Sequence, residues 1–398
     1  MLQQGRYVAD ILWYYSEDTN IAGIYGHELP DIPEGYSYDF INPYGLLNVL
    51  SVKDGALVTD SGMKYRVLVL GEHCGTMSVE VLRKIDALVR AGAVVCGRIP
   101  ERPSGLLDDR AEFDRLVADI WRAGRPNVHT GQLKGVLAAH GVEPDFSYTA
   151  PVELRFVHRD AGSRQIYWIS NLSDERVEAR IALRDGRGVR TVYNAETGET
   201  LQEALDGDRL TLEQGQALFV VCDPEERAEA ARPAPKELGA AALRRAWAVS
   251  FDGPAAPAEP ELFDNLQSLS RFEDPSMKYF SGTATYTNYF TVGKKETVDG
   301  LRIDLGEVYY MADVFVNGEH AGFLWKAPYR LDWFGPLNQG ENTIEVRVIN
   351  LWPNRLIGDA QPGATKAAFT SFTYFYRPDS PLLPAGLVGP VSVTKLQK

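Results

Sequence analysis

The sequence predicts a multidomain protein in which an α/β domain with a parallel sheet precedes two all-β domains. The first 145 residues alternate strand-length apolar runs with helical periodicity, and later segments alternate apolar and polar residues. Between these later segments, residues 224–242 are rich in Glu, Ala, Arg and Pro, a composition typical of a linker. We therefore expect domains at 1–145, 146–223 and 243–398, joined by a linker at 224–242, since 398 residues exceed one ordinary core.

The first domain is predicted to be flavodoxin-like. Compact apolar runs at 8–15, 65–70 and 93–96 have the length and composition of strands that are covered on both faces of a parallel sheet. A helix is expected over 78–92, where apolar residues recur at helical spacing between a Ser that can cap its start and a Gly that can end it. A second helix is expected over about 108–122. This order of elements is that of a right-handed βαβ unit in a doubly wound sheet.

The two later domains are predicted to be antiparallel sandwiches. Period-two segments separated by turn residues indicate a small sandwich first and a jelly roll after it. The expected strands are 152–157, 165–169, 177–183 and 217–222 in the small sandwich, and 283–292, 300–305, 313–317 and 342–349 in the jelly roll.

Composition excludes several classes of function. A net charge of −13, with no stripe of basic residues, disfavours nucleic acid as a partner. No apolar run approaches the ~20 residues of a membrane helix, and residues 1–7 show no secretion signal. The three cysteines are widely spaced, which predicts neither a disulfide framework nor a metal site, and leaves the cellular compartment undecided. No glycine-rich phosphate loop is present, so no nucleotide cofactor is expected.

Several stretches resemble known carbohydrate-active proteins. Residues 280–286, 316–322, 325–330 and 337–343 together resemble the galactose-binding-like sandwich of family 2 glycosidases. Sandwiches of this kind commonly hold a structural calcium, although no set of oxygen ligands stands out in this sequence.

A more specific resemblance spans nearly the whole chain. The segments on which it rests are Asn-Leu-Trp-Pro-Asn-Arg-Leu-Ile-Gly-Asp at 350–359 and Asp-Ser-Pro-Leu-Leu-Pro-Ala-Gly-Leu-Val-Gly-Pro at 379–390. Further similar segments lie at 9–18, 35–42 and 50–55. They resemble the C-terminal half of family 106 α-L-rhamnosidases. That resemblance implies a saccharide or glycoside as the ligand. It also implies that the family's paired glutamates belong to an upstream barrel, so no catalytic glutamate is carried over by motif.

Acidic residues follow two of the expected parallel strands. Glu17 and Asp18 come after the first strand and Glu72 after the second, so their side chains are predicted to share one edge of the sheet. Glycosidases cleave with two carboxyl groups, which makes Glu17 and Glu72 the candidate pair, with Asp18 as an orienting neighbour. The alternative is that these carboxylates cap helices or solvate loops. His27 and Glu28, in a polar loop, are weaker candidates for a sugar contact.

Cys74 also follows the second strand. Amidotransferases with a flavodoxin-like fold place a nucleophilic cysteine at this position, but the cysteine here lacks glycines on both sides and a later His and Glu pair. We therefore expect it to be a structural residue.

Loop-borne aromatic and amide residues predict a sugar-binding surface in the third domain. Flat rings suit the apolar face of a pyranose, while amide and guanidinium groups bind its hydroxyls. The candidate substrate-binding residues are Trp325, Tyr329, Asn350, Trp352, Asn354 and Arg355. The alternative is that these aromatics, with Trp333, pack the sandwich and that Arg355 pairs with Asp359.

Two classes of function therefore remain open from the sequence. The first is a glycoside hydrolase of α-L-rhamnosidase type, and the second is a carbohydrate-binding or scaffold module related to such an enzyme. The sugar, its linkage, the stereochemical outcome and the oligomeric state are not encoded in recognisable motifs.

Overall fold

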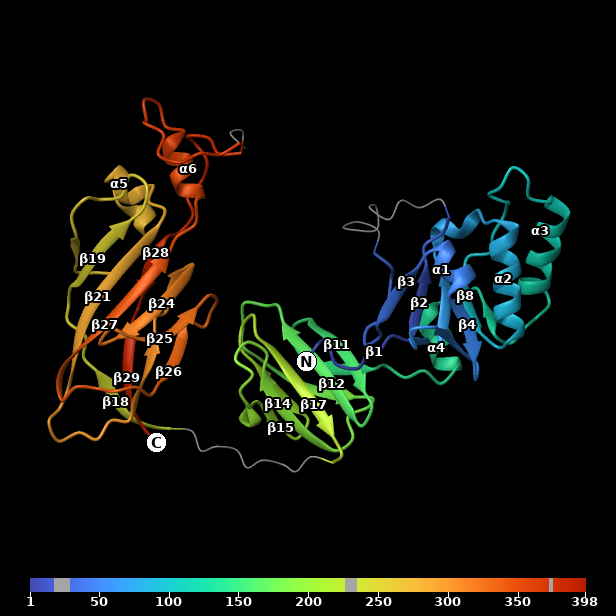
Figure 1. The fold of residues 1–398 in the computed structure, drawn as a ribbon, viewed down its shortest axis with the longest axis horizontal. Coiled ribbons are helices and arrows are strands. Elements are labelled where there is room, and N and C mark those ends of the chain that lie inside the picture. The colour runs from blue at the N-terminus through green and yellow to red at the C-terminus, as the bar shows by residue number, and fades with distance from the viewer. Residues whose placement is uncertain (18–28, 226–234, 372–374) are drawn as a thin grey trace. The chain divides into compact units, whose positions relative to one another are not determined.

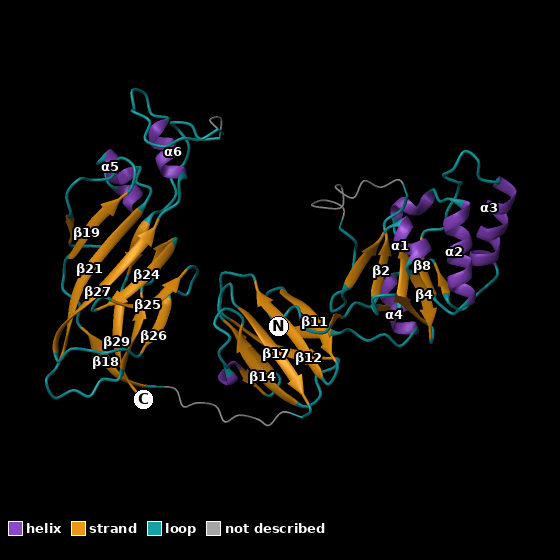
Figure 2. Ribbon diagram, in the orientation of Figure 1, coloured by secondary structure: helices purple, strands orange, loops and turns teal. Residues whose placement is uncertain are grey.

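The computed structural model describes residues 1–17, 29–225, 235–371 and 375–398, and these form two compact units. The first unit comprises residues 1–231 and the second residues 232–398. Both are rich in strands, and the helices are concentrated in the first unit (Figure 1, Figure 2). Among the described residues, no helix is long and apolar enough to cross a membrane.

A five-stranded parallel sheet forms the centre of the first 145 residues. Its strand order is β3-β2-β7-β8-β9, and every neighbouring pair is parallel. The strands are β2 (Ile11–Tyr14), β3 (Tyr38–Ile41), β7 (Val67–Leu70), β8 (Val94–Gly97) and β9 (Val128–His129). The prediction of a parallel α/β sheet is thereby confirmed. Strand β3 was not expected, because its Tyr-Asp-Phe-Ile sequence is only partly buried.

Helices cover both faces of this sheet. One face packs against α1 (Pro43–Asn48), α2 (Val79–Arg90) and α3 (Arg110–Val117), and the other face packs against α4 (Leu133–Ala139). Side chains that alternate along each strand divide between these two cores, as the pleat of a strand requires.

Helix α2 begins and ends at the residues that the sequence predicts. The Ser78 side chain accepts a hydrogen bond from the backbone N–H of Val81, and Gly92 follows the helix in a left-handed conformation with a φ of 101°. A hydrophobic stripe on α2 faces the sheet.

A small antiparallel sheet lies between α1 and β7 in sequence. It consists of β4 (Leu50–Lys53), β5 (Ala56–Thr59) and β6 (Lys64–Tyr65), in the order β4-β5-β6. The hairpin between β4 and β5 turns at Asp54 and Gly55, which both have positive φ.

Two antiparallel sheets pack into a sandwich in the rest of the first unit. The larger has the order β1-β11-β12-β17-β14 and the smaller β10-β13-β16-β15, with a shared apolar core between them. The strands are β1 (Arg6–Tyr7), β10 (Phe146–Thr149), β11 (Leu154–Ala161), β12 (Arg164–Asn171), β13 (Val177–Leu183), β14 (Val189–Asn194), β15 (Leu205–Asp206), β16 (Arg209–Leu212) and β17 (Ala217–Asp223). Strand β1 comes from the start of the chain and pairs with β11, so the sandwich includes residues outside 146–223.

The second unit is a β-sandwich with a six-stranded sheet and a four-stranded sheet. Their orders are β20-β19-β21-β27-β24-β25 and β18-β29-β22-β26, and a two-stranded ladder pairs β23 with β28. The strands are β18 (Lys236–Ala241), β19 (Trp247–Asp252), β20 (Glu261–Phe263), β21 (Thr283–Val292), β22 (Gly300–Asp304), β23 (Glu307–Tyr309), β24 (Met311–Val316), β25 (Glu319–Leu324), β26 (Arg330–Trp333), β27 (Gly340–Ile349), β28 (Gly386–Gly389) and β29 (Ser392–Gln397). Two short helices, α5 (Pro275–Lys278) and α6 (Pro353–Asp359), complete the unit.

The first and last strands of the second unit are neighbours. Strand β18 pairs with β29, with Lys236 opposite Gln397. Residues 236–241, which composition assigns to the linker, therefore form an edge strand of this sandwich. The Glu- and Ala-rich composition conceals the strand because five of its six residues are exposed and only Ala241 is buried.

Candidate functional site

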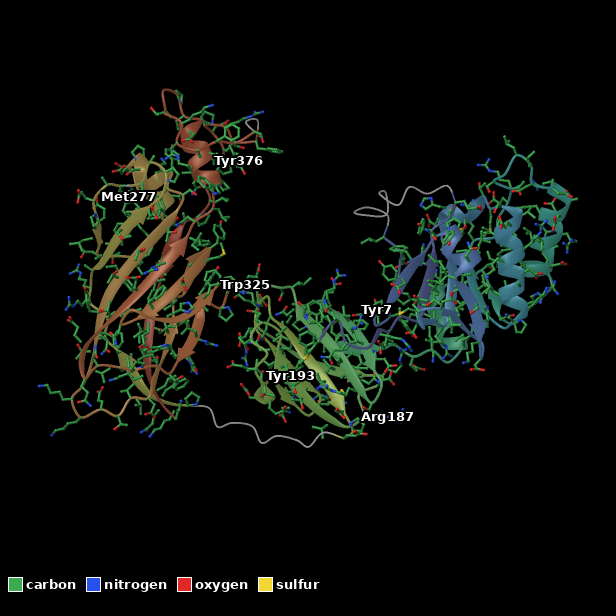
Figure 3. The ribbon with its side chains drawn as sticks, viewed as in Figure 1. Tyr7, Arg187, Tyr193, Met277, Trp325 and Tyr376 are labelled. Carbon is green, nitrogen blue, oxygen red and sulfur yellow. The ribbon has the colours of Figure 1, made fainter. Side chains whose placement is uncertain are left out.

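The strand register of the second unit brings two of the predicted stretches to one end of the six-stranded sheet. Strand β24 lies between β25 and β27, with Ala312 opposite Leu324 and Met311 opposite Ile349. Trp325 and Asn350 directly follow Leu324 and Ile349, so both leave the sheet at this end. Two strand spacings of 4.7–4.9 Å separate their strands, which places the two backbones roughly 10 Å apart. We call this end of the sheet the rim (Figure 3).

Tyr309 and Tyr310, which are not among the candidates from the sequence, lie beside Tyr329 at the rim. Tyr310 immediately precedes β24, and its backbone N–H donates to the carbonyl of Ile349 over 3.1 Å. The Tyr329 hydroxyl donates to the Tyr310 carbonyl over 2.7 Å, and burial raises the pKa of both phenols. Tyr309 packs its ring edge to face against that of Tyr310, with centroids 5.5 Å apart. The Tyr-Tyr pair just before an expected strand was the signal that could have identified them.

Asn350 is buried and only part of its side chain is hydrogen-bonded. Its Nδ2 donates to the carbonyls of Val348 and Gly282, whereas its Oδ1 is buried without a partner among the described residues. The hydroxyl of Ser281, which is 1% exposed and lies in the adjacent chain segment, is also buried without a partner. Buried polar atoms are rarely left unpaired, so each of these oxygens is a candidate position for a bound hydroxyl or water.

Trp325 and Trp352 are both exposed, at 53% and 52% of their surface. Neither ring is therefore committed to the hydrophobic core. Trp333 differs, since it is 8% exposed and belongs to that core. The two exposed rings offer surfaces on which a ligand can stack, and the Lys326 ammonium lies 5.6 Å from the centroid of the Trp325 ring, whereas Trp333 stabilises the sandwich.

The polar residues of α6 have structural contacts. Arg355 donates through Nε to Asp359 over 2.9 Å, and both side chains are more than 90% buried. The second carboxylate oxygen of Asp359 accepts from the backbone N–H groups of Ala367 and Ala368. Asn354 is hydrogen-bonded twice to the backbone of Leu383. These contacts are those of the structural alternative, in which α6 holds the following loop in place.

In the first unit, Glu17 caps a helix. Its carboxylate accepts from the backbone N–H of Ser78 over 2.6 Å, at the start of α2, and from the Ser104 hydroxyl over 3.4 Å. A carboxylate at this position is favoured by the unpaired N–H groups and the positive end of the helix dipole. Asp18, His27 and Glu28 lie outside the described residues.

Glu72 instead lines a cavity of 950 Å³ at the carboxyl ends of the parallel strands. Its carboxylate is exposed and accepts no hydrogen bond from the part of the chain that the structure describes, although its carbonyl accepts from Arg98 over 2.7 Å. Glu17 is not among the residues that line this cavity. The structure therefore gives Glu17 and Glu72 different surroundings.

Cys74 is a buried structural residue. Its thiol is 0% exposed, and burial raises its pKa to about 12. Because the thiolate is the nucleophilic form, a thiol with this pKa is unreactive at neutral pH. This agrees with the structural role expected for it.

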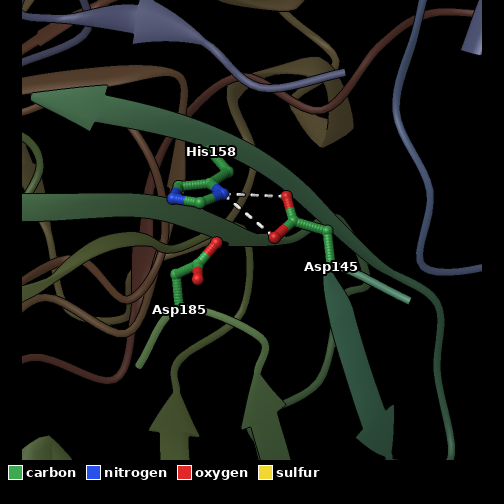
Figure 4. Close-up of side chains that lie close together, drawn as sticks. All are labelled: Asp145, His158 and Asp185. Carbon is green, nitrogen blue, oxygen red and sulfur yellow. Dashed lines mark hydrogen bonds and ion pairs between the residues drawn. The ribbon is translucent and has the colours of Figure 1, made fainter. Parts of the chain in front are cut away.

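One cluster of described residues has the composition of a metal site. Ligand atoms of Asp145, His158 and Asp185 lie within 4.8 Å of one another (Figure 4). The Asp145 carboxylate already binds Nδ1 of His158 at 2.9 Å and accepts from the Tyr167 hydroxyl at 3.1 Å. The Arg184 guanidinium is 3.5 Å from the same carboxylate. A guanidinium in this position repels a second cation, so the cluster fits an ion-pair network better than a metal site.

Comparison with known proteins identifies the family. The sequence model of the glycoside hydrolase 106 family, described as α-L-rhamnosidase, matches residues 1–204, just over half of the chain. The chain belongs to this family.

Two relatives illustrate the extent of the similarity. The structure of a rhamnosidase from Novosphingobium sp. PP1Y is 36% identical, with a TM-score of 0.80 over 99% of this chain and 39% of that one. A protein of Formosa agariphila named "Putative beta-glucuronidase" is 37% identical over 180 residues, which is 39% of this chain and 15% of that protein. The chain thus spans well under half the length of either relative.

Two stretches on which the family resemblance depends contact each other. Asn354 lies in the first stretch, residues 350–359, and Leu383 in the second, residues 379–390. The Asn354 amide donates to the Leu383 carbonyl over 2.8 Å and accepts from its N–H over 2.8 Å. These hydrogen bonds join the two family-like stretches within the second unit.

Proposed function

We propose that this member of the α-L-rhamnosidase family binds saccharide at the rim of its second unit, and thereby serves the hydrolysis of rhamnose-containing glycosides. The observation that carries the proposal is the combination of exposed rings with buried, unpartnered oxygens at one end of a sheet. Trp325 and Trp352 offer surfaces for stacking, and the Oδ1 atom of Asn350 offers an acceptor for a sugar hydroxyl. Tyr329 and Arg355 support the rim through their hydrogen bonds.

The finer fold assignments support the same proposal. The parallel order β3-β2-β7-β8-β9 is the 2-1-3-4-5 order of flavodoxin-like sheets. We assign the second unit to the galactose-binding-like jelly rolls, on the basis of its sequence phrases and its two antiparallel sheets. A structural calcium remains a prediction of that assignment.

Catalysis by the chain itself is a second candidate function, and the exposure of Glu72 favours it. A carboxylate at the lip of a large cavity can protonate a leaving group or activate water. Glu17 and Asp18 remain the proposed partners, with Asp18 orienting Glu17. The hydrogen bonds that Glu17 accepts from Ser78 and Ser104 hold its carboxylate in place beside the start of α2.

Binding at the rim is tested by calorimetric titration with L-rhamnose, D-galactose and D-glucuronate oligosaccharides. Trp325→Ala and Trp352→Ala are each expected to weaken saccharide binding by about 1–3 kcal/mol, because a stacking surface is lost. Both rings are half exposed, so thermal stability should change little. Phe334→Ala is the matched control, since this exposed ring follows the opposite end of β26. Unchanged affinity in both tryptophan variants would refute the rim as a binding site.

Turnover is tested with aryl rhamnosides and other aryl glycosides, by measuring the release of phenol. If the chain hydrolyses a glycoside, Glu72→Gln and Glu17→Gln are expected to lower kcat by at least about 100-fold each, because each removes a group required for proton transfer or nucleophilic attack. A kcat that is unchanged in both variants would exclude this pair.

A further inference from the structure

The cavity of the first unit lies where the fold of a parallel sheet favours ligand binding. It is lined by residues at or just after the carboxyl ends of β2, β7, β8 and β9, including Trp13, Gly71, Gly97 and Thr130. In the order β3-β2-β7-β8-β9, the chain moves outward in opposite directions from β2 and β7. Ligands of open parallel sheets bind beside such a reversal of strand order.

Two of the glycines that line this cavity are at positions where no side chain fits. At Gly71, a Cβ atom would lie 2.9 Å from Nε1 of Trp13, so any side chain would displace the indole. Gly97 has a φ of 125°, and a Cβ there would lie 2.1 Å from the carbonyl oxygen of Leu70. Both positions therefore exclude larger residues. The volume of 950 Å³ lies within the range of small-molecule sites, about 300–1,000 Å³.

The polar groups that line the cavity are largely uncommitted. The side chains of Asp31, Glu72, Thr130, Gln132 and Lys134 are exposed, and none forms a hydrogen bond or ion pair with another described residue. They supply carboxylate acceptors, an ammonium donor, and an amide and a hydroxyl that both donate and accept. The half-buried indole of Trp13 adds a flat apolar surface.

We propose that this strand-end cavity is a second saccharide site, separate from the rim, which takes an uncharged, hydroxyl-rich ring beside the indole of Trp13. Sugar hydroxyls donate and accept hydrogen bonds, so they need the mixture of acceptors and donors found here. An aromatic surface suits the C–H face of the same ring. The proposal goes beyond saccharide binding at the rim, because it concerns a different unit and different residues.

The charges of the cavity argue against a phosphorylated ligand. Asp31 and Glu72 are matched in number by Arg98 and Lys134. Arg98 is already engaged, since its guanidinium donates to the carbonyl of Glu72 and to the carboxylate of Glu101. A phosphate would meet two free carboxylates and one free cation. An uncharged ring avoids that repulsion and still uses every group.

A pair of glycine variants tests the proposal. Gly131 lines the cavity and Gly135 lies one turn further along, outside it; neither has positive φ, and a Cβ at either position meets nothing within 4 Å. Gly131→Phe should therefore fill the cavity mouth without disturbing the fold, and Gly135→Phe is its matched control.

Calorimetric titration of the full chain uses L-rhamnose, D-galactose, D-glucuronate and inorganic phosphate. In a Trp325→Ala, Trp352→Ala background, which removes the rim rings, a neutral sugar should still bind.

Gly131→Phe is expected to weaken that binding at least about tenfold, and Gly135→Phe to leave it unchanged. Glu72→Gln should weaken it as well, whereas Glu80→Gln, which alters an exposed carboxylate on α2 outside the cavity, should not. The proposal is overturned if no sugar binds in the rim-deleted background, if Gly131→Phe leaves the affinity unchanged, or if only phosphate binds. If the two tryptophan substitutions leave the affinity unchanged while Gly131→Phe lowers it, the proposed function is refuted and this site is retained.

Discussion

Two buried polar clusters, one in each unit, differ in how completely their atoms are paired. Around His158 in the first unit, Nδ1 faces the Asp145 carboxylate and Nε2 faces Oε1 of Gln165 at 2.9 Å. The Gln165 amide nitrogen donates elsewhere, to Asp160 and Gly162, so its orientation is fixed. At the rim of the second unit, Oδ1 of Asn350 and the hydroxyl of Ser281 have no partner within the described parts of the chain.

This difference separates structural polar groups from candidate binding groups. A buried network with complete pairing stabilises one arrangement of the chain, and Arg184 extends the His158 network to Asp10 at the start of β2. A buried oxygen without a partner costs stability unless another molecule supplies a donor. Charge and burial alone favour the first cluster as a candidate site, whereas the unpaired oxygens favour the second.

The largest expected effect is that of breaking the paired cluster. Asp145→Ala should reduce the free energy of unfolding of the first unit by about 3–5 kcal/mol, because it leaves the buried His158 without its carboxylate partner and removes one of the two buried carboxylates beside Arg184, which keeps Asp10. Urea unfolding measures this loss. Asp114→Ala, which removes an exposed i,i+4 partner of Arg110, should change stability by no more than about 0.5 kcal/mol. Equal losses in the two variants would show that the buried Asp145 network contributes no more to stability than an exposed ion pair.

A smaller effect is expected at the rim. Asn350→Ala removes the two hydrogen bonds of Nδ2 and should cost the second unit about 1–3 kcal/mol, while Ser281→Ala removes a hydroxyl without a partner and should cost nothing. Thermal melting with and without rhamnoside distinguishes the two roles of Asn350. A saccharide should raise the melting temperature of the wild type more than that of Asn350→Ala. An equal rise in both would assign Asn350 to structure alone.

The smallest effect concerns a histidine pair in the first unit that is less buried than either cluster. Nε2 of His129 lies 2.8 Å from Nε2 of His140. Burial is the main cause that lowers the pKa of His140, and the nearby His129 and Arg66 lower that pKa further. A lowered folded pKa means that the unfolded chain binds the proton more readily. The free energy of unfolding should therefore fall as the pH drops below about 6.5, and level off below the folded pKa.

His140→Gln should flatten this part of the stability profile, measured by urea unfolding between about pH 5 and 8. His320, which is exposed and pairs with Asp313 in the second unit, provides the control: His320→Gln should leave the profile of the first unit unchanged. A profile for His140→Gln that keeps the wild-type slope would contradict the assignment.

Local patterns predicted much of the fold. Helix α2 was predicted by Ser78, Gly92 and the apolar stripe between them, because capping and periodicity depend on neighbouring residues. Strand β21 occupies 283–292 as expected, since one face of it is buried along its whole length. Strands β1 and β18 were missed, because they are short or exposed and depend on partners more than 150 residues away.

The candidate site was less predictable, because it depends on pairing between distant strands. Trp325 and Asn350 were selected by residue type, yet only the register of β24 shows that they share one end of a sheet. Tyr310 was missed for the same reason. Asn354 and Arg355 were selected as ligands because amide and guanidinium groups suit sugars, but the same groups also suit the backbone of Leu383 and the carboxylate of Asp359. Residue type does not distinguish these partners.

The pairing of β18 with β29 bears on how the second unit could be moved between proteins. Lys236 and Gln397 are opposite each other, so their Cα atoms are roughly 5 Å apart. A module whose entry and exit points adjoin can be inserted into a surface loop of an unrelated host without forcing the two flanks of that loop apart. The same adjacency suits circular permutation, in which a short peptide joins residue 397 to residue 236 and new ends are opened elsewhere. We therefore expect the second unit to keep its fold when it is inserted into a surface loop of another protein or circularly permuted.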